Sequence, residues 1–175
     1  MFTGALAASY YGTPLTTMHI DIITRISGED SINKLISALK MAGLEVDRRR
    51  IDSAPRSGFR IVTFKDNKAP FTVDIILSST DFAKKAGSIL GLPTFYQTPE
   101  ELILAKLRMI KATIPRERAP KDEDDVKAIL KSTKVNINVI KKRARNDNAL
   151  SILRIITAET PSQKIWGKVL AQTSM

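Results

Sequence analysis

The chain contains no cysteine and only one histidine among its 175 residues. The lack of cysteine excludes disulfide bonds, thiolate catalysis and cysteine-bound zinc, and one histidine cannot build a histidine-rich metal cage. No apolar run approaches the roughly 18 residues of a membrane-spanning helix, and the N-terminus lacks the pattern of a signal peptide. We therefore expect a cytoplasmic protein without a membrane partner.

Acidic residues are also scarce, with 18 Asp and Glu against 28 Lys and Arg and a formal net charge of +10. Residues 106–145 hold most of the excess, with thirteen basic and five acidic residues. A surface of this kind attracts phosphate-bearing partners through electrostatics alone. A solvated helix face in a basic protein explains the same charge, and the composition leaves both interpretations open.

Hydrophobic periodicity predicts an α/β (α+β) fold in two regions. Residues 1–95 are expected to form an α/β core with a mixed sheet of about four or five strands flanked by helices, and residues 96–175 a helical C-terminal region. The expected strands are residues 19–24, a short strand at 46–51, and a hairpin of 58–64 with 71–77. The expected helices are a short one before residue 12, then 27–43, 79–90, one from residue 98, one from 121, 138–145, 148–157 and 162–171.

Small and polar residues follow one another in a distinctive order in the first region: Gly4-Ala5, Thr16-Thr17, His19-Ile20-Asp21, and Asp74 in a later strand. This order resembles the nucleotidyltransferase superfamily, particularly the minimal nucleotidyltransferases and the nucleotidyltransferase-like toxins of toxin–antitoxin systems. In that family a glycine turn and a short helix precede an Asp-x-Asp strand, and a third aspartate lies on a neighbouring strand. The likeness extends over residues 1–130 through a lysine-bearing helix and a basic and acidic segment at 116–125.

The resemblance implies a nucleoside triphosphate bound with a divalent metal, magnesium or manganese. Hard cations prefer carboxylate oxygen, two strand positions one residue apart share a face, and a glycine turn offers backbone N–H groups to phosphate. It further implies an RNA or protein acceptor and an antitoxin-like partner, and we keep a homodimer as an expectation. The catalytic and metal-binding residues would be His19, Asp21 and Asp74, and the nucleotide-binding residues Gly4, Ala5, Thr16 and Lys106.

His19 departs from the family pattern, because it stands in place of the first aspartate of Asp-x-Asp. Imidazole prefers softer metals than magnesium. His19 could be a manganese ligand beside Asp21 and Asp74, a general base, the mark of a degenerate site that binds without turnover, or a plain strand histidine. The sequence therefore leaves open whether the protein is an active nucleotidyltransferase or a module that binds nucleotide, RNA or protein.

Charged residues outside this set carry two further expectations. Lys106 falls on the apolar stripe of its helix, so its ammonium must either snorkel to solvent or meet an anion, such as a triphosphate or Asp74. Two basic clusters could follow a nucleic-acid backbone or be solvated faces. Their candidate nucleic-acid-binding residues are Arg48, Arg49, Arg50, Lys141, Lys142 and Arg143.

Overall fold

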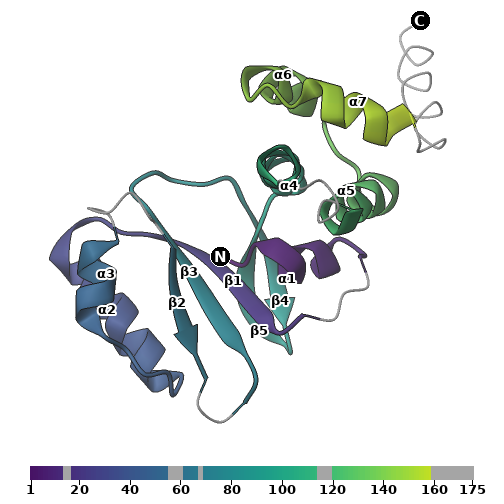
Figure 1. The fold of residues 1–175 in the computed structure, drawn as a ribbon. Helices are drawn as coiled ribbons and strands as arrows, with labels where there is room; N and C mark the ends of the chain where they lie inside the picture. Colours follow the sequence, from purple (N-terminus) through teal and green to yellow (C-terminus); the bar gives the residue numbers. More distant parts are fainter. Residues whose placement is uncertain (14–16, 55–60, 67–68, 114–119, 159–175) are drawn as a thin grey trace, which may run out of the picture. The chain divides into compact units, whose positions relative to one another are not determined.

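The computed structural model describes residues 1–13, 17–54, 61–66, 69–113 and 120–158 (Figure 1). The chain forms two compact units. The first, called the sheet unit, comprises Met1–Ser9 and Pro14–Thr98, and the second, called the helical unit, comprises Tyr10–Thr13 and Pro99–Met175. The boundary at Thr98 lies close to the division expected after residue 95, whereas the short segment Tyr10–Thr13 belongs to the helical unit.

Five strands and three helices make up the described part of the sheet unit, with α1 (Gly4–Tyr10) reaching into the helical unit by one residue. A three-stranded sheet has the order β1-β3-β2, with β1 (His19–Arg25) parallel to β3 (Thr72–Ser78) and β2 (Ile61–Lys65) antiparallel to it. A second sheet pairs β4 (Lys84–Ile89) with β5 (Leu92–Gln97) in antiparallel fashion. The prediction of a mixed α/β fold is confirmed.

The core of the sheet unit lies on one face of the three-stranded sheet, where α2 (Gly28–Met41) and α3 (Arg48–Ser53) cover it (Figure 1). Alternate residues of each strand enter this core, because successive side chains of a strand point to opposite faces. The intervening residues of β1, β2 and β3 therefore point to the other face. The buried core residues include Leu39, Ile51, Val62, Phe64, Val73, Ile75 and Leu77.

A single residue near the N-terminus, Phe2, joins the two sheets. Its N–H donates to the carbonyl of Phe95 (2.8 Å), and its own carbonyl accepts from the N–H of Gln97 (2.9 Å), both in β5. Its ring lies 5.9 Å from the ring of Tyr96, centroid to centroid. Phe2 thus extends the small sheet by one strand position.

The neighbours of Phe2 make the corresponding bonds on the side of β1. The Thr3 N–H donates to the carbonyl of Asp21 (2.9 Å), and the Met1 carbonyl accepts from the N–H of Ile23 (2.9 Å). Backbone N–H and C=O groups in a sheet need such partners, and here they come from both sheets at once. The start of the chain therefore links all five strands of the sheet unit.

The expectation of a short strand at residues 46–51 is wrong, because this segment leads into α3. Asp47 caps the helix, accepting a hydrogen bond from the Arg49 N–H at 2.9 Å. An aspartate at this position satisfies a backbone donor that the first helical turn leaves free, and arginine is a good helix former. Ile51 is the residue that α3 buries in the core.

The expectation of a helix at residues 79–90 is also wrong, because these residues lead into β4 and the hairpin with β5. The turn consists of Leu90 and Gly91, which have φ of 49° and 79° and lie between the paired residues Ile89 and Leu92. Two consecutive residues with positive φ match the right-handed twist of a two-residue hairpin. The positive φ is a conformational cost for Leu90, and its side chain, which is 97% exposed, gains no buried contacts in return.

Four helices form the described part of the helical unit after residue 98: α4 (Pro99–Ala112), α5 (Pro120–Ser132), α6 (Ile137–Asn146) and α7 (Leu150–Ala158). The helices predicted from residues 98 and 121, and at 138–145 and 148–157, are confirmed, while the one expected at 162–171 lies outside the described residues. None of the described helices is long and apolar enough to cross a membrane. The buried residues include Leu102, Leu107, Val126, Ile129, Ile140, Leu153 and Ile156.

The segment Tyr10–Thr13 is tied into the helical unit by both packing and hydrogen bonding. The carbonyl of Tyr11 accepts a hydrogen bond from Oγ1 of Thr133 (3.2 Å). The Tyr11 side chain is buried, and desolvation raises its pKa to about 12. Tyr11 therefore packs into the helical unit, whereas the neighbouring Tyr10 is 37% exposed.

We expect Leu90→Asn to stabilise the protein by about 0.5–1 kcal/mol, since asparagine tolerates positive φ far better than leucine. Urea unfolding of the full chain measures the change. Leu92→Asn is the matched control, because Leu92 is also exposed but lies in β5, where asparagine is unfavourable. A loss of stability in Leu90→Asn would contradict the assigned turn geometry.

Candidate functional site

Three of the predicted site residues share the face of the sheet that α2 and α3 leave uncovered. In the parallel pairing of β1 with β3, Asp21 lies directly opposite Asp74, and His19 is opposite Thr72. Register partners point to the same face, as do His19 and Asp21, which are two positions apart. The structure therefore places both carboxylates in one row, with the imidazole on the same side.

Asp74 is the best anchored of these side chains. Its Oδ1 accepts a hydrogen bond from Oγ1 of Thr63 at 2.5 Å, and Thr63 is its register partner in β2. The side chain of Asp74 is 22% exposed, so the carboxylate is still partly accessible to solvent. The hydroxyl fixes the carboxylate rotamer and leaves Oδ2 to face other groups.

His19 approaches Asp74 without forming a hydrogen bond. Its Nδ1 lies 3.8 Å from Oδ2 of Asp74, which is beyond hydrogen-bond distance, and the side chain is 63% exposed. Thr17 holds the backbone of His19 in place: Oγ1 of Thr17 accepts from the His19 N–H and lies within donating distance of its carbonyl, both at 3.1 Å. The imidazole therefore has room to turn toward a ligand or away from it.

Gly4 lies against the side chain of Asp21 so closely that no other residue fits there. A Cβ built on Gly4 would come within 2.7 Å of Cγ of Asp21, and the φ of Gly4 is 58°, a region that favours glycine. The hydrogen bond from the Thr3 N–H to the Asp21 carbonyl sets this approach. The predicted glycine turn thus meets the predicted carboxylate, and Ala5 follows within α1.

Lys106 has two carboxylate partners inside the helical unit and does not snorkel to solvent. Its ammonium donates to Oδ1 of Asp122 at 3.1 Å and also to Oδ2 of Asp125. Lys106 is 7% exposed and Asp125 is 2% exposed, so the charges are paired in the interior. Removal of one partner would leave a buried charge uncompensated, which is costly.

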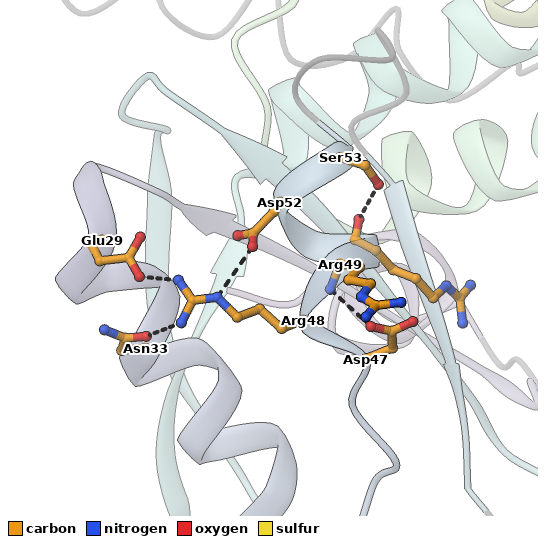
Figure 2. A network of polar contacts seen from close by, with 8 residues as sticks. Glu29, Asn33, Asp47, Arg48, Arg49, Asp52 and Ser53 are labelled. Atoms are coloured by element: carbon orange, nitrogen blue, oxygen red, sulfur yellow. Dashed lines mark hydrogen bonds and ion pairs between the residues drawn. The ribbon is translucent and has the colours of Figure 1, made fainter.

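One arginine of the predicted basic cluster on α3 is already engaged in internal hydrogen bonds and ion pairs, as Figure 2 shows. The guanidinium of Arg48 donates to Asn33 at 3.0 Å and to Asp52 at 3.2 Å, and it also pairs with Glu29. The hydrogen bond to Glu29 is the main cause that raises the pKa of Arg48 above its ordinary value. Arg49 and Arg50 remain the exposed cations of this cluster.

The second basic cluster likewise contains one residue with an internal ion pair and two exposed cations. Arg143 forms a two-pronged pair with Glu101, with its NH2 group 2.9 Å from Oε2. Lys141 and Lys142 are exposed on α6. Thr16, the remaining predicted nucleotide contact, lies outside the described residues.

A divalent cation would find hard oxygen ligands in this row but no complete protein cage. In the described parts of the chain, no group of three or more His, Cys, Asp or Glu side chains is arranged to hold a metal ion. Magnesium is commonly held by one or two carboxylates together with substrate phosphates and water. The donor set of Asp21 and Asp74 fits that second kind of site.

Sequence reasoning missed Thr63 as a site residue. It lies in an expected strand, but its role depends on the antiparallel register that places it opposite Asp74. A threonine in a strand is ordinary, so only the strand pairing reveals the role of Thr63.

No protein-family model and no curated protein matches the chain.

We expect Gly4→Ala to destabilise the protein by about 2–4 kcal/mol, because the new methyl group adds overlap with Asp21 to the cost of positive φ. Gly43→Ala is the control: Gly43 has a φ of 80° but no atom within 4 Å of an added Cβ, so it tests conformational strain alone, at about 1 kcal/mol. Urea unfolding compares the two. Equal losses would show that the close approach of Gly4 to Asp21 is not present.

Proposed function

We propose that this protein is nucleotidyltransferase-like and binds a nucleoside triphosphate with a divalent metal at the face that carries Asp21 and Asp74. The observation that carries the proposal is the placement of these two carboxylates in one row of the parallel pair β1 and β3, beside the Gly4 turn. Two carboxylates that lie directly opposite each other on neighbouring strands repel one another. A cation shared by both would offset this repulsion, which supports the proposal.

Each residue has a distinct task in this proposal. Asp21 and Asp74 hold the cation, which would neutralise the phosphate charge and orient the triphosphate. Thr63 keeps Asp74 in position. Gly4 lets the chain pass directly over Asp21. Lys106 already has Asp122 and Asp125 as partners, so the proposal does not depend on it.

Transfer of the nucleotidyl group to RNA or protein, as by a toxin-type enzyme, is the activity that we propose for this site. The acceptor hydroxyl would attack the α-phosphorus, the bond from that phosphorus to the bridging oxygen would break, and pyrophosphate would leave. The hydroxyl proton must pass to a base. In this proposal the base is the imidazole of His19, which lies 3.8 Å from Asp74 and is 63% exposed.

A second candidate is a catalytically degenerate site of the same fold that binds without turnover. The specific observation in its favour is the imidazole of His19, which lies 3.8 Å from Asp74 where the resembled family has a carboxylate. Imidazole is a poor ligand for magnesium, so only two hard ligands remain. Such a protein would bind nucleotide, RNA or a protein partner.

We expect magnesium or manganese with a nucleoside triphosphate to raise the melting temperature by about 5–10 °C when the ligand is near 100 times its Kd. Asp21→Ala and Asp74→Ala should remove the shift, because each deletes one of the two carboxylate ligands. Asp30→Ala is the matched control, since Asp30 is an exposed acid on α2, which covers the opposite sheet face. An unchanged shift in both site variants would refute the proposal.

His19→Asp separates the two candidate functions, because it supplies a third hard ligand for magnesium. If the site is degenerate, the natural chain shows no incorporation of labelled nucleotide into RNA or protein, and the variant binds magnesium about tenfold more tightly. If His19 is the base, the natural chain transfers nucleotide and the variant loses activity while binding is retained. A variant with neither change would count against any role of His19 at the site.

A further inference from the structure

Helix α6 presents a continuous basic face to solvent. Asn138, Lys141, Lys142 and Arg145 are all exposed and follow the spacing i, i+3, i+4 and i+7, so they lie on one side of the helix. We call these four residues the α6 basic face. The helix contains four basic residues and no acidic residue. Its apolar residues Ile140 and Ala144 are fully buried, whereas Val139 is 41% exposed.

The acidic residues of α4 that approach α6 are already used by other groups. Glu101 is paired with Arg143, and Glu100 accepts from the N–H of Asn136, the capping residue of α6, at 2.9 Å. Beyond the end of the helix, Asp147 is paired with Arg108 at 2.8 Å. Because these acids already have partners, they do not neutralise the positive charge of the α6 basic face.

The three cations of this face have no acidic partner among the residues that the structure describes. Lys141, Lys142 and Arg145 form no ion pair within the described ranges. Three positive side chains within two helical turns repel one another, by a few tenths of a kcal/mol for each pair. A bound polyanion would relieve this repulsion, and the relief would favour binding.

Contacts along its length hold the helix rigidly in the helical unit. The Asn136 side chain caps its first turn, accepting from the Val139 N–H at 3.2 Å, and Lys111 donates to the carbonyl of Asp147 at 2.9 Å. Together with the pair of Arg143 and Glu101, these bonds fix α6 against α4. A preformed surface loses little conformational entropy when a ligand binds.

We propose that the α6 basic face binds the phosphodiester backbone of a nucleic acid. Lysine and arginine contact phosphate without reading sequence, and Asn138 adds an amide donor on the same face. A membrane surface fits less well, because a helix that lies in a membrane needs a broad free apolar side, whereas Ile140 and Ala144 of α6 are buried and Val139 alone offers little apolar area. An acidic protein fits less well too, since this face lacks the aromatic anchors typical of protein interfaces.

This inference does not rest on the proposed function, because it requires neither nucleotide nor metal. The test measures binding of the full chain to fluorescent 20-nucleotide single-stranded RNA and DNA between 50 and 200 mM salt, without triphosphate. The variant is Lys141→Gln, Lys142→Gln and Arg145→Gln combined. The matched control is Lys34→Gln, Lys40→Gln and Lys65→Gln combined, which removes three exposed cations from α2 and β2, outside both basic clusters.

We expect the α6 variant to bind at least about tenfold more weakly at 50 mM salt, and the slope of log affinity against log salt to fall by about 2, since each phosphate contact in a single strand contributes about 0.7. The control should retain its affinity within about twofold. RNA and DNA bound alike, or RNA preferred, both support a phosphodiester ligand. Circular dichroism with a thermal melt verifies that the α6 variant is folded.

Three results would overturn the inference. The first is no salt-dependent binding of either nucleic acid, and the second is an equal loss in the control and the α6 variant. The third is equal or tighter binding to polyglutamate, or to vesicles that contain phosphatidylserine, under the same conditions. Asp21→Ala should leave nucleic-acid binding intact, so failure here and failure of the nucleotide site are distinguishable.

Discussion

The sheet unit depends on the backbone of Phe2, which is bonded to β5 while its neighbours are bonded to β1. These hydrogen bonds join a two-stranded and a three-stranded sheet that would otherwise be separate. An isolated two-stranded hairpin is only marginally stable in water, so β4 and β5 need this connection. The same bonds place the following residues, Thr3 and Gly4, directly over Asp21.

The candidate site follows from this joint and from the pairing of β1 with β3. Parallel pairing puts Asp21 and Asp74 in one row, and the hydrophobic core on the opposite face holds that row fixed. Gly4 closes one side, where a side chain would collide with Asp21. The site is thus built from rigid strands and a backbone contact, and His19 is its exposed and adjustable member.

Periodicity predicts the elements whose own residues determine them. The apolar stripes of α2, α4 and α5 and the β-branched runs of β1, β2 and β3 are visible in the sequence, and so is the pair of aspartates. The segment around β4, with Lys84, Lys85 and Ala86, contains good helix formers, and only its pairing with β5 makes it a strand. Asp47 as a helix cap and Thr63 as the partner of Asp74 depend on local geometry and register, which composition does not encode.

We propose that Asp21 and Asp74 share one cation together with a nucleoside triphosphate. The most direct measurement is a crystal structure of the protein grown with manganese and a non-hydrolysable triphosphate, with the metal located by its anomalous signal. We expect one manganese ion within coordination distance of both carboxylates, with triphosphate oxygens completing its shell. An anomalous peak elsewhere, or a nucleotide bound away from this face, would contradict it.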